Sequence, residues 1–151
     1  MKFLVLPIIL LLGSSLLFAQ SKVMRTLAEK YPETTTFVIY HSQFTMLNQS
    51  DDPEIAALAS TIDKIKVLTF DSFGSAAKKE LISDLESSGF EALMMIKHKG
   101  SNIEAYIFED EGNIKGYFLI AESDENTMAI DVLGSPDAKQ IGKIIDMVKK
   151  H

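Results

Sequence analysis

The sequence predicts an α+β fold, in which a mostly antiparallel sheet packs against separate helices. Two observations support this prediction. Between residues 90 and 133, four segments rich in β-branched and aromatic residues follow one another with only short turns between them, which is typical of an antiparallel meander. Before and after this run lie segments whose apolar residues recur at helical spacing. Strands that follow one another beside separate helices indicate the α+β class.

Four helices are expected, and each has a sequence signal at one of its ends. Pro32 ends the first helix, because proline cannot continue one. Asp52-Pro53 and Ser135-Pro136-Asp137 each combine a capping residue with a proline that suits the first helical turn. Gly89 suits the left-handed residue that often follows a helix. The expected helices cover residues 21–31, 53–62 and 75–88, and the last begins at residue 135.

Six strands are expected, of which the last four form the meander. With antiparallel neighbours and short turns, pairing Ile96 with Ile103 and Ile107 with Gly116 gives each strand one apolar face. The first two strands add to an edge of the sheet, in an order that the sequence does not show. The expected strands are residues 34–40, 64–70, 90–97, 102–109, 114–121 and 127–133.

The same register assigns side chains to the two faces of the sheet. Around the last turn it pairs Ile120 with Met128, which continues one apolar face into the final strand. We expect the helices to pack mainly on this face. It is formed by Ala105, Ile107, Phe118, Ile120 and Ile130.

The opposite face is mixed rather than polar, and it provides a candidate partner surface. Tyr106 and Tyr117 stand directly opposite each other in this register, with Leu93 and Leu119 beside them. Tyrosine combines a large apolar area with a polar tip, and it is enriched at protein interfaces. Two interpretations are open here: a helix covers this face, or the face is a docking surface.

The composition excludes several partners. The chain has a formal net charge of −6 and no basic patch, so neither nucleic acid nor an anionic membrane surface is an expected partner. It has no cysteine, which excludes disulfides and a lipid anchor attached through a cysteine. The fold therefore depends on its apolar core.

The N-terminus predicts export. Lys2 precedes an apolar run from Phe3 to Leu12, and Ala19 offers a small residue at a cleavage site. We therefore expect a signal peptide over residues 1–19, a single α+β domain over residues 20–151, and a periplasmic or secreted protein. No membrane contact is expected beyond the signal. An uncleaved membrane anchor is the alternative, because the apolar stretch is only slightly shorter than the roughly 20 residues that span a bilayer.

Residues that could support chemistry do not form a recognisable motif. The histidines His41, His98 and His151 lack the spacing of metal ligands, and His41 and Ser42 would point apart in an extended segment. Acidic loops at residues 109–113 and 122–126 are typical of solvated turns, and the second resembles a calcium loop only weakly. We expect no catalytic residue, no metal site and no cofactor.

Several segments resemble the DUF4252 family of small exported bacterial proteins, found mostly in the Bacteroidetes. The similar segments are Leu17-Phe18-Ala19-Gln20, Phe37-Val38-Ile39-Tyr40, residues 62–68 and Phe90-Glu91-Ala92-Leu93-Met94. The resemblance implies a periplasmic address, with Gln20 as the first mature residue, and no established activity. Some members of the family are encoded near extracytoplasmic-function sigma factors, which implies an envelope-stress or signalling context.

Two functional hypotheses follow. The preferred one is a non-enzymatic binding or interaction module of the cell envelope, whose partner is another envelope protein or a second copy of the chain. The alternative is a small periplasmic enzyme, similar to a hydrolase, with a site assembled only in the fold.

Overall fold

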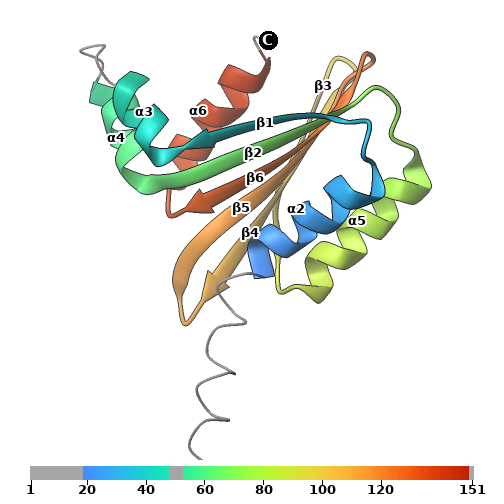
Figure 1. The fold of residues 1–151 in the computed structure, drawn as a ribbon, viewed down its shortest axis with the longest axis horizontal. Coiled ribbons are helices and arrows are strands. Elements are labelled where there is room, and N and C mark those ends of the chain that lie inside the picture. The colour runs from blue at the N-terminus through green and yellow to red at the C-terminus, as the bar shows by residue number, and fades with distance from the viewer. Residues whose placement is uncertain (1–18, 48–52, 150–151) are drawn as a thin grey trace, which may run out of the picture.

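The protein forms one six-stranded sheet with helices on both sides (Figure 1). The computed structural model describes residues 19–47 and 53–149. The expected signal segment therefore lies outside the described residues, except for Ala19, which begins a helix. The strands are β1 (Thr35–Tyr40), β2 (Ile62–Phe70), β3 (Glu91–His98), β4 (Ser101–Asp110), β5 (Asn113–Glu122) and β6 (Thr127–Gly134). The helices are α2 (Ala19–Lys30), α3 (His41–Leu47), α4 (Pro53–Thr61), α5 (Ser75–Ser87) and α6 (Ala138–Lys149).

The strand order is β1-β2-β6-β5-β4-β3, and every neighbouring pair is antiparallel. The predicted α+β class and the predicted meander are both confirmed. The two early strands join the sheet beside β6, which leaves β1 at one edge and β3 at the other. Helix α5 connects β2 to β3, so this connection crosses the sheet from one half to the other.

Helices cover both faces of the sheet, so the expectation that they pack mainly on one face is wrong. Figure 1 shows α2 and α5 side by side on one face, with α3, α4 and α6 on the other. Leu81 and Leu85 of α5 join one buried cluster with Met24 of α2. Ile141 and Ile144 of α6 belong to a second cluster. The sheet is therefore the middle layer between two cores.

The signals at Pro32 and Gly89 act where they were expected, whereas α6 begins at Ala138 rather than residue 135, and Asp52 lies outside the described residues. Gly89 has a φ of 92°, and the amides of residues 88–90 bond the last carbonyls of α5. At the start of α6, the Asp137 carboxylate accepts a hydrogen bond from the Gln140 amide at 2.9 Å. The Gln140 side chain in turn accepts one from the Asp137 amide at 2.9 Å, so the two residues form a reciprocal cap. Helix α3 was not expected from the sequence.

The predicted register holds near the first turn and then fails at a bulge. Ile96 pairs with Ile103, as predicted. The next strand pair follows the predicted register only at the turn, because an irregularity at Phe108/Glu109 shifts it by one residue. Tyr106 therefore faces Phe118 rather than Tyr117.

The last hairpin carries the same one-residue difference. Its loop pairs Glu122 with Thr127, so Ile120 faces Ala129 rather than Met128. A one-residue shift moves a side chain to the other face of the sheet. Phe118 and Ile120 therefore lie with Tyr106 in the core under α2 and α5, while Ala105 and Ile130 lie in the core under α4 and α6. The predicted single apolar face is wrong, because each face is apolar.

Candidate functional site

The predicted partner surface does not exist as one surface. Tyr106, Tyr117 and Leu119 are buried, with exposures of 6%, 2% and 1%. Tyr106 lies in the core beneath α2 and α5, whereas Tyr117 and Leu119 lie in the core beneath α4 and α6. Only Leu93 reaches the surface, with 41% exposure. The cause of this error is the register shift, which separates the tyrosines onto opposite faces.

Both tyrosine hydroxyls are used inside the protein. The Tyr117 hydroxyl donates a 2.7 Å hydrogen bond to the Pro136 carbonyl, which fixes the connection between β6 and α6. The Tyr106 hydroxyl donates to Glu104 Oε2 at 3.0 Å. Of the two interpretations of this region, coverage by helices is therefore correct for both residues.

A polar network ties helix α5 to the sheet around Glu104. Lys78 Nζ lies 2.7 Å from Glu104 Oε1 and 2.7 Å from Glu122 Oε2. Asn102 Nδ2 donates to the same two carboxylates, at 3.2 Å and 3.1 Å, and Tyr106 completes the set. Asn102 Oδ1 is buried without a hydrogen-bond partner in the described part of the chain. Because each charge has an opposite charge beside it, the network holds α5 in place.

The charges of this network stabilise one another. Burial alone would raise the pKa of Glu104, but its hydrogen bonds from Lys78, Tyr106 and Asn102 hold that pKa below the usual value. Burial and the bond to Glu104 together raise the pKa of Tyr106 to about 12. Glu104 is thus a carboxylate and Tyr106 a neutral donor at neutral pH, and neither is suited to exchange a proton there.

Asp131 is the most perturbed acid among the described residues. Its side chain is buried in the middle of β6, between Lys66 on β2 and Phe118 on β5. Burial raises its pKa to about 7, although the charges of Lys64 and Lys66 oppose the shift. Its Oδ1 atom is buried without a hydrogen-bond partner in the part of the chain that the structure describes. A carboxyl group poised near neutral pH is a candidate for proton chemistry, but the whole residue is only 3% exposed.

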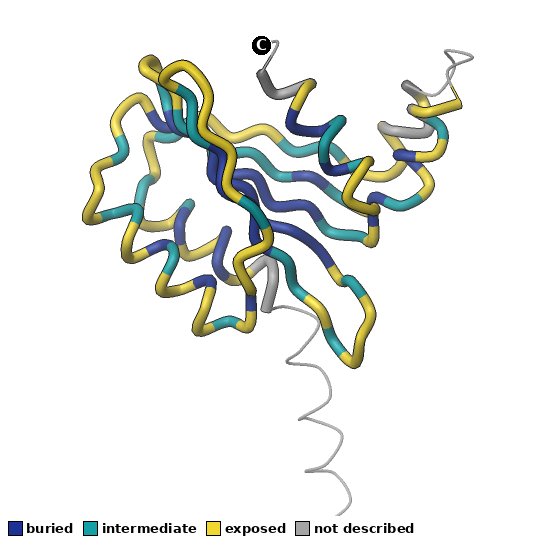
Figure 2. Tube along the Cα trace, turned by 180° about the vertical axis from the view of Figure 1, so that it is seen from behind, coloured by how far each residue is buried: buried dark blue, intermediate teal, exposed yellow. Residues whose placement is uncertain are grey.

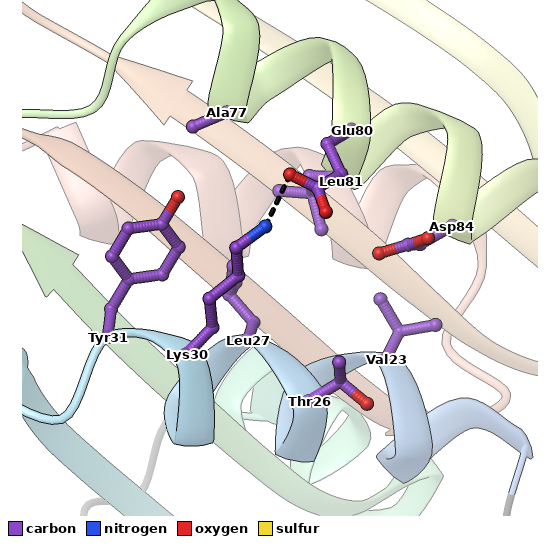
Figure 3. A pocket seen from close by; sticks show the side chains of 9 residues that line it. All are labelled: Val23, Thr26, Leu27, Lys30, Tyr31, Ala77, Glu80, Leu81 and Asp84. Atoms are coloured by element: carbon purple, nitrogen blue, oxygen red, sulfur yellow. Dashed lines mark hydrogen bonds and ion pairs between the residues drawn. The ribbon is translucent and has the colours of Figure 1, made fainter.

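A shallow groove separates α2 from α5 (Figure 3). Its volume is about 40 Å³, far below the roughly 300 Å³ at which ligand pockets begin. Figure 3 shows the Lys30–Glu80 ion pair crossing the groove between the two helices. The ion pair therefore connects two helices, and the remaining space holds no substrate-sized molecule.

The described histidines and acidic residues form no metal-binding group, and His151 lies outside the described residues. His41 begins helix α3 rather than extending β1, and its Nδ1 atom donates to the Ile62 carbonyl at 2.9 Å. His98 lies at the end of β3, and Glu122 is held by the network around Lys78. Among the described residues, no group of three or more His, Cys, Asp or Glu side chains could hold a metal ion. No helix within those residues is long and apolar enough to cross a membrane.

The edge strand β3 is unusually apolar for its exposure. Every residue from Glu91 to His98 is exposed except Met94, which is partly buried (Figure 2). Met95, Leu93 and Ile96 are 59%, 41% and 36% exposed. Among the described residues β3 pairs only with β4, so in this part of the chain its outer side offers free backbone donors and acceptors. A long apolar edge strand of this kind is a template for pairing with another strand.

The other edge differs from β3 in its surroundings. Strand β1 also exposes large side chains, with Phe37 at 58% and Tyr40 at 54%. It is shorter, and its end runs directly into helix α3. Lys64 Nζ lies 5.6 Å from the centre of the Tyr40 ring, so one of the two exposed aromatic side chains already has a cation–π contact within the chain. Strand β3 is therefore the better candidate for a binding edge.

Sequence reasoning missed Ile96 as a surface residue, and it placed Met95 on the mixed face without including Met95 in the partner surface. The pattern assigned Ile96 to a covered face, because the whole meander was expected to share one core. The signal that could have identified them is the position of β3 at the far end of the meander, after the crossover through α5. A terminal strand has only one neighbour, and the described helices lie mainly over the inner strands.

The fold and its exposed edge define a small α+β protein with a six-stranded antiparallel sheet between two helical layers. The chain belongs to the family described as "Domain of unknown function (DUF4252)", which it matches over residues 29–144. This match confirms the resemblance that the sequence suggested. A comparison with curated proteins found no match.

Proposed function

We propose that this DUF4252 protein is a non-enzymatic interaction module of the bacterial cell envelope, and that it binds through the outer edge of β3. The observation that supports this function best is the exposure of Leu93, Met95 and Ile96 on a strand with one free side. Main-chain hydrogen bonds to a free edge provide affinity, and the alternating side chains provide specificity.

The envelope address is a proposal that rests on the N-terminal sequence. Lys2, the apolar run after it and Ala19 form the pattern of a secretory signal. We propose cleavage after Ala19, which would start the mature chain at Gln20. The intact mass of the natively produced protein tests this proposal. A mass that includes residues 1–19 would support the membrane-anchor alternative instead.

Position-specific cross-linking in the cell tests the binding edge. A photoreactive phenylalanine analogue at position 95 should yield a covalent adduct, whereas the same analogue at position 37 should not. The two sites form a matched pair, because Met95 and Phe37 are 59% and 58% exposed at opposite edges of one sheet. The proposal fails if position 95 yields no adduct, or if both positions react equally.

The enzymatic alternative rests on Asp131. A buried carboxyl group with a raised pKa is typical of acid–base catalysts. However, Asp131 does not line the groove between α2 and α5. An enzyme of this kind needs its acid to reach a substrate, and Asp131 is only 3% exposed. The exposure of β3 therefore favours the interaction module.

A further inference from the structure

We propose that the partner of the β3 edge is a second copy of this chain, paired antiparallel with the first about a two-fold axis at Met95. The pairing would join two six-stranded sheets into one continuous sheet. This inference rests on the proposed function of the edge and names its occupant. It is carried by the arrangement of side chains along β3, which is complementary to itself when reversed.

The first step concerns which face of the sheet each residue of β3 occupies. The register between β3 and β4 shifts between Ala92 and Met94, so Leu93 is an extra residue. Glu91 pairs with Ile107 and His98 pairs with Ser101, and these two partners lie on the same face of β4. Without the bulge, residues seven apart would point to opposite faces. The bulge therefore brings Glu91 and His98 onto one face.

The second step is to place a reversed copy beside β3, with Met95 opposite itself. Met94 then lies opposite Ile96, and these two residues share a face because they pair with Ala105 and Ile103. Beyond them, the bulge lets Ala92 and Leu93 together oppose Lys97. Ala92 and Lys97 again share a face, since their partners on β4 are Tyr106 and Asn102. Residues that lie opposite each other in the two copies of β3 therefore point to the same face of the joined sheet.

The third step concerns charge. In this arrangement Glu91 of each copy lies opposite His98 of the other, and the positive charges near it are those of Lys97 and Lys99 on either side of His98. Opposite charges facing each other across two strands stabilise their pairing, and like charges oppose it. Residues 91–99 contain one acidic and two lysine residues, whereas the whole chain has a net charge of −6. The β3 edge is thus a place where two acidic copies meet without strong repulsion.

Apolar contacts complete the interface. The Met95 side chains would meet on the axis, and Met94 would pack against Ile96 on the other face. The aliphatic stem of Lys97 can cover the bulged Leu93 while its ammonium group stays in water. An interface that pairs a strand with itself closes after two copies, because the same edge is used on both sides.

Strand β1 does not offer the same complementarity. Residues 35–40 carry no charged side chain, so nothing in β1 distinguishes one register or direction from another. Joining β1 of one copy to β3 of the next would use two different edges and would extend without closing. The pairing of β3 with itself is the arrangement that both satisfies the charges and ends at a dimer.

Two variants that place a positive or a negative charge at Met95, on the proposed axis, test the proposal in solution. Sedimentation velocity should show a dimer for the purified protein, in the N-terminal form that cells produce. Met95→Lys and Met95→Glu should each weaken association at least about tenfold, because each places two like charges together on the axis. An equimolar mixture of the two variants should restore the dimer. Phe37→Lys, at the opposite edge, should leave the dimer intact, and circular dichroism checks that every variant is folded.

The outcomes separate this inference from the proposed function. A protein that stays monomeric at all concentrations overturns the second copy as partner. Dissociation caused by Phe37→Lys alone overturns the pairing of β3 with itself, because the two copies would then meet at β1. Loss of the dimer in both single variants without recovery in the mixture overturns the axis at Met95. A cross-link from position 95 to a different protein, together with a monomer in solution, overturns the second copy but supports the binding edge. Absence of any cross-link from position 95 overturns the edge itself.

Discussion

At the scale of single residues, burial decides the behaviour of the side chains that the sequence marked as functional. Tyr106 and Tyr117 are core residues whose hydroxyls bond inside the protein, so their role is structural. Asp131 has no sequence signal of its own, because an acidic residue within an apolar strand reads as an ordinary polar position. Only the packing of α2 and α5 over this face makes it a buried acid.

Asp131 predicts a pH dependence of stability. Its folded pKa of about 7 lies above the value of about 3.9 in an unfolded chain, so the folded state holds this proton more tightly. The stability that this proton provides is complete below about pH 4 and is lost as the pH rises to about 7. Asp131→Asn cannot ionise, so it should be more stable than the wild type at pH 8, by about 4 kcal/mol.

Urea unfolding at pH 5 and pH 8 measures this effect. The difference in unfolding free energy between wild type and Asp131→Asn should grow with pH. Comparing the two proteins at the same pH cancels the contribution of the other titrating groups, because both proteins share them. If the difference in unfolding free energy is the same at pH 5 and pH 8, the pKa of Asp131 is not raised by folding, which would contradict its burial as a neutral acid.

A second prediction contrasts two residues that the sequence placed on one surface. Tyr106→Ala should lower the unfolding free energy by about 3–5 kcal/mol, since it removes a buried ring. Leu93→Ala should change it by no more than about 0.5 kcal/mol, because Leu93 is 41% exposed. Thermal unfolding of both variants decides the matter, and a tolerated Tyr106→Ala would contradict the placement of this ring in the core.

At the scale of elements, turns and bulges set what the strands can do. The predicted helices and strands form because capping residues, prolines and β-branched runs act locally. The register depends instead on one extra residue of β5, Lys115, opposite Phe108/Glu109, and on the length of the last hairpin loop. Strand β5 is continuously apolar from Tyr117 to Ala121, so alternation could not reveal the shift. The sequence therefore predicted the elements other than α3 and missed the faces of the strands.

Gly134 provides a prediction at this scale, because it ends β6 against the start of β2. Its φ is 137°, and a Cβ atom there would lie 2.2 Å from the Thr61 carbonyl oxygen. Gly112 also has a positive φ, of 77°, but a Cβ atom there would meet nothing within 4 Å. Gly134→Ala should therefore cost at least about 3 kcal/mol, whereas Gly112→Ala should cost only about 1–2 kcal/mol of backbone strain.

Chemical denaturation of the two glycine variants separates the effects of crowding and conformation. If the two substitutions cost the same, the close approach of Gly134 to the β2 start does not constrain the fold. This junction matters because Ser135 also donates its amide to the Thr61 carbonyl, at 3.0 Å.

At the scale of the whole molecule, two helical layers cover the inner strands and leave the edges to solvent. The composition predicted a core without disulfides, and both faces of the sheet provide one. It could not predict the exposed edge, because the position of β3 depends on the long crossover through α5. Ile96 looks like a core residue in the sequence, and its exposure emerges only from the order of the strands.

Hydrogen–deuterium exchange across a range of protein concentrations tests the pairing of β3 most directly. Amides of residues 92–98 that point outward have no strand partner among the described residues of one chain, and they should exchange rapidly when the protein is dilute. As the concentration rises, these amides should become protected, while those of residues 35–40 in β1 should not change. Concentration-dependent protection of β1 instead, or a β3 edge that stays unprotected at every concentration, would contradict the account.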